Sequence, residues 1–229
     1  IDYFSSFMKI ITLIAAFLVL TISSSYLKTL KLLKIEYPIL ILSSVLGMMI
    51  MISSNDLIVF YMGLELQSLS LYVLASFNRD NLLSTESGLK YFVLSALSSG
   101  LLLYGCSLIY GFSGSTNFNE ISISISNVQY GLTFGLVFIL VGLAFKISAV
   151  PFHMWAPDVY QGSPTSVTIF FAILPKIAAL TVFIRFLYVP FINMIDQWQM
   201  IIIFLSIASM TFGAFAAIGQ KNLKRLTAY

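Results

Sequence analysis

Long apolar segments separated by short polar loops make up almost the whole chain. A helix needs about twenty apolar residues to cross a bilayer, and seven segments approach that length. They run at about 3–23, 38–52, 57–77, 91–112, 130–150, 166–189 and 198–218, and an eighth helix is expected to begin near Leu223. This pattern predicts an all-α fold, a polytopic membrane helix bundle.

The connections between these segments are mostly short and polar, such as 53–56 and 78–81. The longest connection, 113–129, is rich in serine, asparagine and isoleucine, and it leaves open a loop or a short β-hairpin outside the membrane. We expect residues 1–229 to form a single transmembrane domain. The chain starts at Ile1 and ends at Tyr229, a few residues into the eighth predicted helix, so we expect it to be part of a longer protein.

Composition agrees with a membrane protein. Hydrophobic residues make up 59% and charged residues 9% of the chain, whereas a soluble domain has about a quarter charged residues. The net charge of +3 gives no indication of nucleic-acid binding. One cysteine, Cys106, excludes a disulfide within the chain, and one histidine, His153, leaves no zinc or haem site to expect.

The positive residues divide unevenly when the predicted spans alternate across the membrane. Lysine and arginine accumulate on the inner side of membrane proteins. One face collects Lys28, Lys31, Lys34, Arg79, Lys90, Lys221, Lys224 and Arg225, whereas the other has only Lys9 and Arg185 near its helix ends. The first face is therefore predicted to lie in the cytoplasm or the mitochondrial matrix.

Three ionisable residues lie inside the predicted spans: Glu65, Lys146 and Lys176. A charge near the bilayer centre costs about 2.5–3.5 kcal/mol on insertion scales. Such residues usually pair with each other or line a water-filled path, and proton relays are a leading reason for keeping them. We therefore expect these three residues to form a proton relay.

Prolines accompany both lysines. Lys146 precedes Pro151 by five residues, and we expect a broken helix there that resumes briefly over 152–155. Non-helical backbone at membrane depth is tolerated only where protein buries it or a cavity hydrates it, as at ion sites of transporters. Lys176 follows Pro175, and a proline kinks a helix and frees a carbonyl group.

Lysine suits a relay because burial and a nearby carboxylate shift its proton affinity in opposite directions. Changing the distance between Glu65 and its lysine would then load or release a proton, which arginine could not do. Two simpler interpretations remain open: Glu65 and Lys146 form a structural ion pair, or Lys176 extends toward the membrane surface.

Four further polar residues have less specific interpretations. His153 is either a proton shuttle beside the break or the partner in a structural hydrogen bond. Asp158 and Tyr160 are expected to cap or brace the next helix, and Lys90 to anchor its helix at the membrane interface.

The run from Gly142 to Thr165, GLAFKISAVPFHMWAPDVYQGSPT, closely resembles the signature of NADH dehydrogenase subunit 2. That family is an antiporter-like membrane subunit of respiratory complex I. Further matches to it are YMGLELQSLSLYVLASF at 61–77, ESGLKYFVLSALSSGLLLYGCSLIYG at 86–111, LPKIAAL at 174–180 and QKNLKRLTAY at 220–229.

The resemblance implies an antiporter-like fold of two inverted five-helix repeats, the first at about 38–189 and the second mostly absent from this chain. Three residues of that family correspond to Glu65, Lys146 and Lys176. They are a glutamate, a lysine on the broken helix and a lysine on the following helix. The implied function is proton translocation within NADH:ubiquinone oxidoreductase, a translocase of the respiratory chain. The alternatives are a subunit of a stand-alone cation/proton antiporter and a non-conducting structural subunit.

The same resemblance implies partners and a location. The complex would use NADH, FMN, iron–sulfur clusters and ubiquinone, with no redox centre in this chain. Other complex I membrane subunits, including neighbouring antiporter-like and small ones, lipids and protons would be its partners, and nucleic acid would not. The expected location is the mitochondrial inner membrane, with a bacterial plasma membrane as the alternative.

Overall fold

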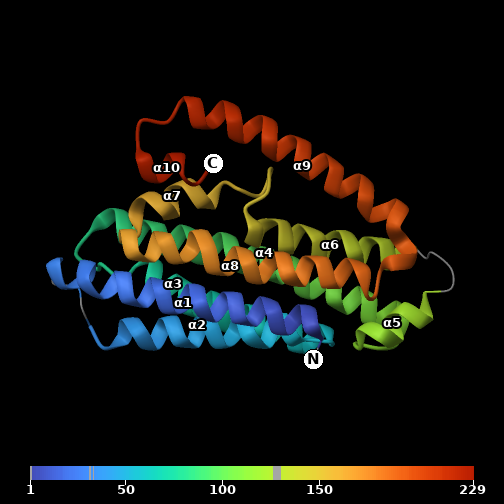
Figure 1. The fold of residues 1–229 in the computed structure, drawn as a ribbon. Helices are drawn as coiled ribbons and strands as arrows, with labels where there is room; N and C mark the ends of the chain where they lie inside the picture. The colour runs from blue at the N-terminus through green and yellow to red at the C-terminus, as the bar shows by residue number, and fades with distance from the viewer. Residues whose placement is uncertain (1, 31, 33, 126–129) are drawn as a thin grey trace.

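A bundle of long helices accounts for most of the chain in a computed structural model, which describes residues 2–30, 32, 34–125 and 130–229 (Figure 1). Within these described residues, seven helical segments are long and apolar enough to cross a membrane. They are α1 (Tyr3–Thr29), α2 (Glu36–Ser53), α3 (Leu57–Ala75), α4 (Leu82–Ser113), α6 (Tyr130–Ile147), α8 (Thr165–Tyr188) and α9 (Ile195–Ile218), the last preceded by a 3-10 turn, η1 (Ile192–Met194). The predicted all-α bundle and its seven spans are confirmed.

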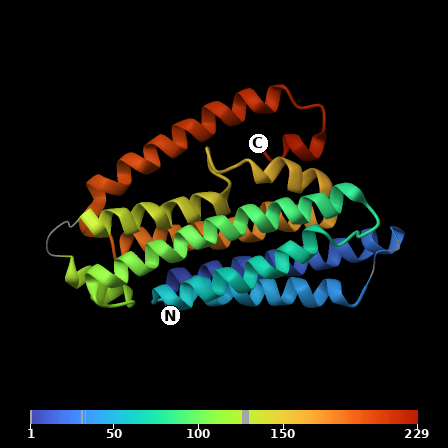
Figure 2. The same ribbon diagram turned by 180° about the vertical axis from the view of Figure 1, so that it is seen from behind.

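Three shorter helices complete the described part of the chain: α5 (Phe118–Ser124), α7 (Trp155–Gly162) and α10 (Leu223–Leu226). The last of these is the predicted eighth helix, which ends after four residues. The helix α7 follows the break after α6 and packs beside α4 (Figure 2).

The long connection contains a helix, so the predicted loop or β-hairpin is wrong for its described part. Asn117 caps α5 by accepting a hydrogen bond from the Asn119 N–H at 3.0 Å. Strand-like pairing at this end is limited, within the described residues, to an isolated bridge between Asp56 and Asn117. Asp56 also accepts from the Thr116 hydroxyl at 2.6 Å, which holds the connection against the start of α3. Residues 126–129 lie outside the described part.

Two helix pairs approach each other through glycine. On α2, a Cβ added at Gly47 would lie 2.6 Å from the Gln67 backbone nitrogen and 2.7 Å from the Gly63 carbonyl oxygen of α3. On α4, a Cβ at Gly105 would lie 2.8 Å from the Gly135 carbonyl oxygen of α6. Small residues allow this close packing of helices in membranes, and here it joins α2 to α3 and α4 to α6.

The helix α9 differs from the other spans in its burial. It runs diagonally past the bundle (Figure 1), and Trp198 is its one buried residue. Its many exposed apolar side chains require lipid or other apolar protein around them, because water would leave them unfavourably solvated.

The predicted positive face has partial structural support. Lys34 and Arg79, from two different connections, line one cavity at the end of the bundle where α2 and α4 begin. At the same end, Lys90 and Arg225 bond to Asp158 of α7, and Lys224 bonds to the carbonyl of Ser163, the residue that follows α7. Lys31 lies outside the described residues. Which side of a membrane this end faces stays a prediction.

Candidate functional site

Lys146 lies in the last turn of α6 and is only 8% exposed. Its ammonium group donates hydrogen bonds to the Ser68 hydroxyl of α3 at 2.8 Å and to the Ser95 hydroxyl of α4 at 2.6 Å. The close packing of α3, α4 and α6 therefore creates a polar site in an otherwise apolar interior. A buried charge requires such partners because its desolvation is costly.

The hydroxyl groups around Lys146 extend further. The Tyr72 hydroxyl donates to Ser95 at 2.7 Å, so Ser95 accepts from two donors. The Ser68 hydroxyl in turn donates a hydrogen bond to the Leu64 carbonyl oxygen at 2.6 Å. The sequence pattern did not identify Ser95 or Tyr72 as part of this site. Serine is too common in membrane helices for its pattern alone to have singled out Ser95.

Glu65 lies on the same helix as Ser68, three residues earlier, so the two are neighbours on α3. It interacts electrostatically with Lys146. In the described chain, however, no ion pair within 4 Å includes Glu65, and its Oε1 atom is buried without a hydrogen-bond partner. The simple ion pair between Glu65 and Lys146 is therefore not formed in this structure.

Backbone hydrogen bonds cap the C-terminal end of α6. Ser148 has a positive φ of 63°, and its N–H donates to the Phe145 carbonyl at 3.0 Å. The next N–H, of Ala149, reaches the Ala144 carbonyl at 2.9 Å. These two bonds form a Schellman motif, which satisfies carbonyl groups that a helix end otherwise leaves free.

The predicted break is therefore present, but its limits differ from those expected. The helix ends at Ile147 rather than near Pro151, because the left-handed Ser148 ends it first. The prediction that it resumes over 152–155 is wrong, because α7 begins at Trp155. Pro151 lies within the irregular segment, where it cannot extend the helix that Ser148 has ended.

Trp155 bridges the two sides of the break. Its indole N–H donates to the Phe145 carbonyl at 2.9 Å. Its ring stacks on Tyr91 of α4, with centroids 4.7 Å apart, and on Phe145 at 5.6 Å. Trp155 of α7 thus holds Phe145, the residue next to Lys146. Tyr91 of α4 in turn packs against the Trp155 ring.

Lys176 follows the buried Pro175 within α8 and is half-buried. Its ammonium group lies 5.7 Å from the centre of the Tyr160 ring of α7, within the range of a cation–π contact. Tyr160 is fully buried and its hydroxyl has no hydrogen-bond partner. The structure does not join Lys176 directly to Lys146 or Glu65, and the contact of its ammonium group is with the face of the Tyr160 ring.

His153 lies in the break but is turned toward α9 rather than toward the three charged residues. Its ring contacts Phe212 with centroids 4.8 Å apart and Tyr229 at 5.9 Å. Its Nδ1 atom is buried without a hydrogen-bond partner. Neither a shuttle nor a structural hydrogen bond is demonstrated, and the role of His153 stays a prediction.

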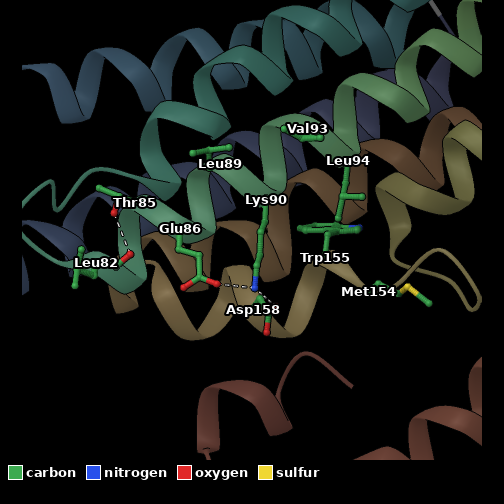
Figure 3. Close-up of a pocket in the computed structure, with 10 residues that line it drawn as sticks. All are labelled: Leu82, Thr85, Glu86, Leu89, Lys90, Val93, Leu94, Met154, Trp155 and Asp158. Atoms are coloured by element: carbon green, nitrogen blue, oxygen red, sulfur yellow. Dashed lines mark hydrogen bonds and ion pairs between the residues drawn. The ribbon is translucent and has the colours of Figure 1, made fainter.

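A second charged group lies beside the break, on the side of the predicted positive face. Lys90 forms ion pairs of 2.7 Å with Glu86 and with Asp158 of α7 (Figure 3). Asp158 also pairs with Arg225. Burial alone would raise the pKa of Asp158, but the hydrogen bonds from Lys90 and Arg225 outweigh it and place the pKa below its usual range. Asp158 therefore stays ionised and braces α7, the helix that contains it, against the earlier helix α4 rather than capping or bracing the next helix as predicted.

A cavity of about 880 Å³ adjoins this group. Lys90, Asp158 and Trp155 line it together with apolar side chains of α4 (Figure 3). It extends along α4 from the charged group to the indole that bridges the break. Within the described ranges, no group of three or more histidine, cysteine or carboxylate side chains could hold a metal ion.

Removing the Ser95 hydroxyl should measurably destabilise the protein. In Ser95→Ala, Lys146 and Tyr72 each lose a hydrogen-bond acceptor. A hydrogen bond to a charged group contributes about 1.5–3 kcal/mol, so we expect the melting temperature in detergent to fall by about 3–10 °C. Ser107→Ala is the control, since Ser107 is an exposed residue of α4 whose hydroxyl bonds only to Tyr104 of its own helix. Equal melting temperatures for the two variants would contradict the site geometry.

Comparison with known proteins identifies the family of this chain. Residues 54–229 match the family described as NADH:quinone oxidoreductase/Mrp antiporter, TM. The chain is 78% identical over its full length to NADH-quinone oxidoreductase subunit N of Pelagibacter ubique, of which it covers 49%. It thus spans about half the length of the curated relatives that it matches.

Solved structures share the fold. One chain of respiratory complex I from Thermus thermophilus with bound aureothin is 34% identical, with a TM-score of 0.82 over 100% of this chain and 48% of that one. A chain of the Mrp complex from Dietzia sp. DQ12-45-1b has a TM-score of 0.87 over 99% of this chain and 42% of that one. At 23% identity, the Dietzia likeness shows the fold alone.

These comparisons confirm the predicted family and bear on two details of the prediction, the subunit and the location. The similarity to antiporter-like membrane subunits of complex I is confirmed. The relative found is named subunit N, however, and not subunit 2. Pelagibacter ubique and Thermus thermophilus are bacteria, so these comparisons give no support to the mitochondrial inner membrane.

Proposed function

Because the chain belongs to the NADH:quinone oxidoreductase/Mrp antiporter transmembrane family, we propose that it translocates protons as a membrane subunit of an NADH-quinone oxidoreductase. Glu65, Lys146 and Lys176 would carry the protons. The observation that supports this most directly is the buried ammonium group of Lys146, held by two hydroxyl groups at the end of a broken helix. A purely structural lysine would gain more from a direct carboxylate partner, and Glu65 lies nearby without forming that pair.

The site can respond to small movements. The carbonyl end of α6 carries partial negative charge, so the energy of a charge on Lys146 depends on how the helix end is held. The unpaired Oε1 of Glu65 can move toward or away from the ammonium group, which would change the energy further. A proton leaving Lys146 would leave a neutral amine that still accepts a hydrogen bond from a serine hydroxyl.

Transfer onward to Lys176 requires water in this arrangement. The two lysines share no hydrogen bond, and Tyr160 is the aromatic residue against Lys176. Its buried, unpartnered hydroxyl could bond to a water molecule between α7 and α8. The irregular backbone of 148–154 and the cavity beside Trp155 would supply that water from the surface.

The energy for pumping would come from electron transfer in other subunits. NADH, FMN, iron–sulfur clusters and quinone would bind there, and this chain would hold no redox centre. Other membrane subunits and lipids would cover its exposed apolar surface.

Given the bacterial relatives, we propose a bacterial plasma membrane as the location of this protein, with its lysine-rich end in the cytoplasm. We also propose that residues 38–189 form the first inverted repeat.

A second candidate function is supported by one observation. The family description that residues 54–229 match also names the Mrp antiporter, which makes a stand-alone cation/proton antiporter the alternative. Such a protein would use the same buried lysine, but an ion gradient would drive it instead of electron transfer.

Purification of the full-length protein through an affinity tag should separate the two candidates. We expect it to copurify with subunits that oxidise NADH and show the absorbance of flavin and iron–sulfur clusters. A preparation without NADH oxidation that exchanges cations for protons in liposomes would favour the antiporter and contradict the proposed function.

A further inference from the structure

The break after α6 leaves backbone donors in the middle of the bundle. Ser148 and Ala149 bond back to the helix end, but Val150 lies beyond the reach of that motif. A backbone N–H at membrane depth without a partner costs several kcal/mol. Val150 therefore needs an acceptor from another element.

The acceptor is Ser209 of α9, which lies 59 residues further along the chain. The Val150 N–H donates to the Ser209 hydroxyl oxygen at 3.0 Å. The Ser209 hydroxyl donates a hydrogen bond to the Leu205 carbonyl oxygen at 2.6 Å, so its own oxygen can still accept the hydrogen bond from Val150. The geometry thus uses both capacities of one hydroxyl group.

A second contact joins the same two elements. His153, three residues after Val150, places its ring against Phe212, three residues after Ser209, with centroids 4.8 Å apart. Both Ser209 and Phe212 lie one turn apart on the face of α9 that meets the break. Trp198, the one buried residue of α9, lies far from this point. These two contacts therefore join α9 to the break although the α9 residues that make them are not buried.

We propose that Ser209 is a positioning residue that holds the broken segment, and through it the end of α6 that carries Lys146. Movement of α9 would pull on Val150, four residues after Lys146, and change how the ammonium group meets Ser68 and Ser95. The helix α9 would then transmit conformational changes to the relay. This inference rests on the proposed function for its effect on pumping, although the contact itself does not.

The test compares Ser209→Ala with Ser206→Ala in the full-length protein within its native membrane complex. Ser206 lies one turn earlier on α9, is exposed, and bonds only to Ile203 of its own helix. We expect Ser209→Ala to speed hydrogen–deuterium exchange in peptides covering 148–154 and to lower the rate of proton pumping roughly five- to tenfold, in line with the loss of one buried hydrogen bond. Ser206→Ala should change neither, and Ser209→Thr, which keeps a hydroxyl, should restore both.

The outcomes separate this inference from the proposed function. If Ser209→Ala and Ser206→Ala show the same exchange over 148–154, the contact does not hold the break and the inference is wrong. Faster exchange with unchanged pumping would contradict the positioning role. Lys146→Met, measured in parallel, tests the relay by itself: if it pumps normally, the proposed function fails whatever the exchange shows.

Discussion

Replacing Lys146 with methionine should abolish proton pumping while the protein still assembles. Methionine is unbranched and flexible, so it can fill the space of the lysine stem. Ser68 keeps its bond to the Leu64 carbonyl and Ser95 its bond from Tyr72, so no hydroxyl loses its last partner. What disappears is the group that holds the proton, and losing a proton-transfer group costs on the order of 10²–10⁴-fold in rate.

The measurement is proton translocation in sealed vesicles against NADH oxidation by the same preparation. Lys28→Met is the matched control, because it removes the same charge from an exposed position in the last turn of α1. We expect that variant to pump as the unmodified protein does. A normal ratio of protons to electrons in Lys146→Met would refute the relay.

Adding a single methyl group at Gly47 should have the largest effect on stability. The new Cβ would lie 2.6 Å from the Gln67 nitrogen and 2.7 Å from the Gly63 oxygen. Both are backbone atoms of α3, so neither can turn away as a flexible side chain would. Overpacking costs about 1–3 kcal/mol or more, and we expect Gly47→Ala to lower the amount of assembled protein in the membrane several-fold.

The same change at Gly100 provides the control. No atom lies within 4 Å of a Cβ built there, and alanine is favoured over glycine inside a helix by about 1 kcal/mol. Gly100→Ala should therefore accumulate normally and melt at the same temperature or slightly higher. Equal losses in both variants would show that the contact between α2 and α3 is not what limits assembly.

The Gly47→Ala protein that does assemble should also pump protons poorly, because the displaced helix α3 carries both Glu65 and Ser68.

The chain's hydrophobic pattern was sufficient to predict the spans because each spanning helix satisfies its own backbone hydrogen bonds. The same local reasoning found Lys146, since a charge in an apolar run is visible without knowing its neighbours. It misplaced the break, however. Proline marked the region, but Ser148 ends the helix by adopting a positive φ, which residues other than glycine adopt only when surrounding structure supports it.

The partners of the charged residues were decided by tertiary structure alone. Ser95 and Tyr72 became part of the site because α3, α4 and α6 meet there, so that Ser95 accepts hydrogen bonds from both the Lys146 ammonium group and the Tyr72 hydroxyl. The hydrogen bond between the Val150 N–H and the Ser209 hydroxyl likewise depends on packing between elements that lie 59 residues apart in the chain. The sequence by itself determined that this protein is a membrane bundle with charges inside it, since that depends on the local balance of apolar and polar residues. Which groups surround those charges depends on packing between helices distant along the chain, and no local pattern encodes it.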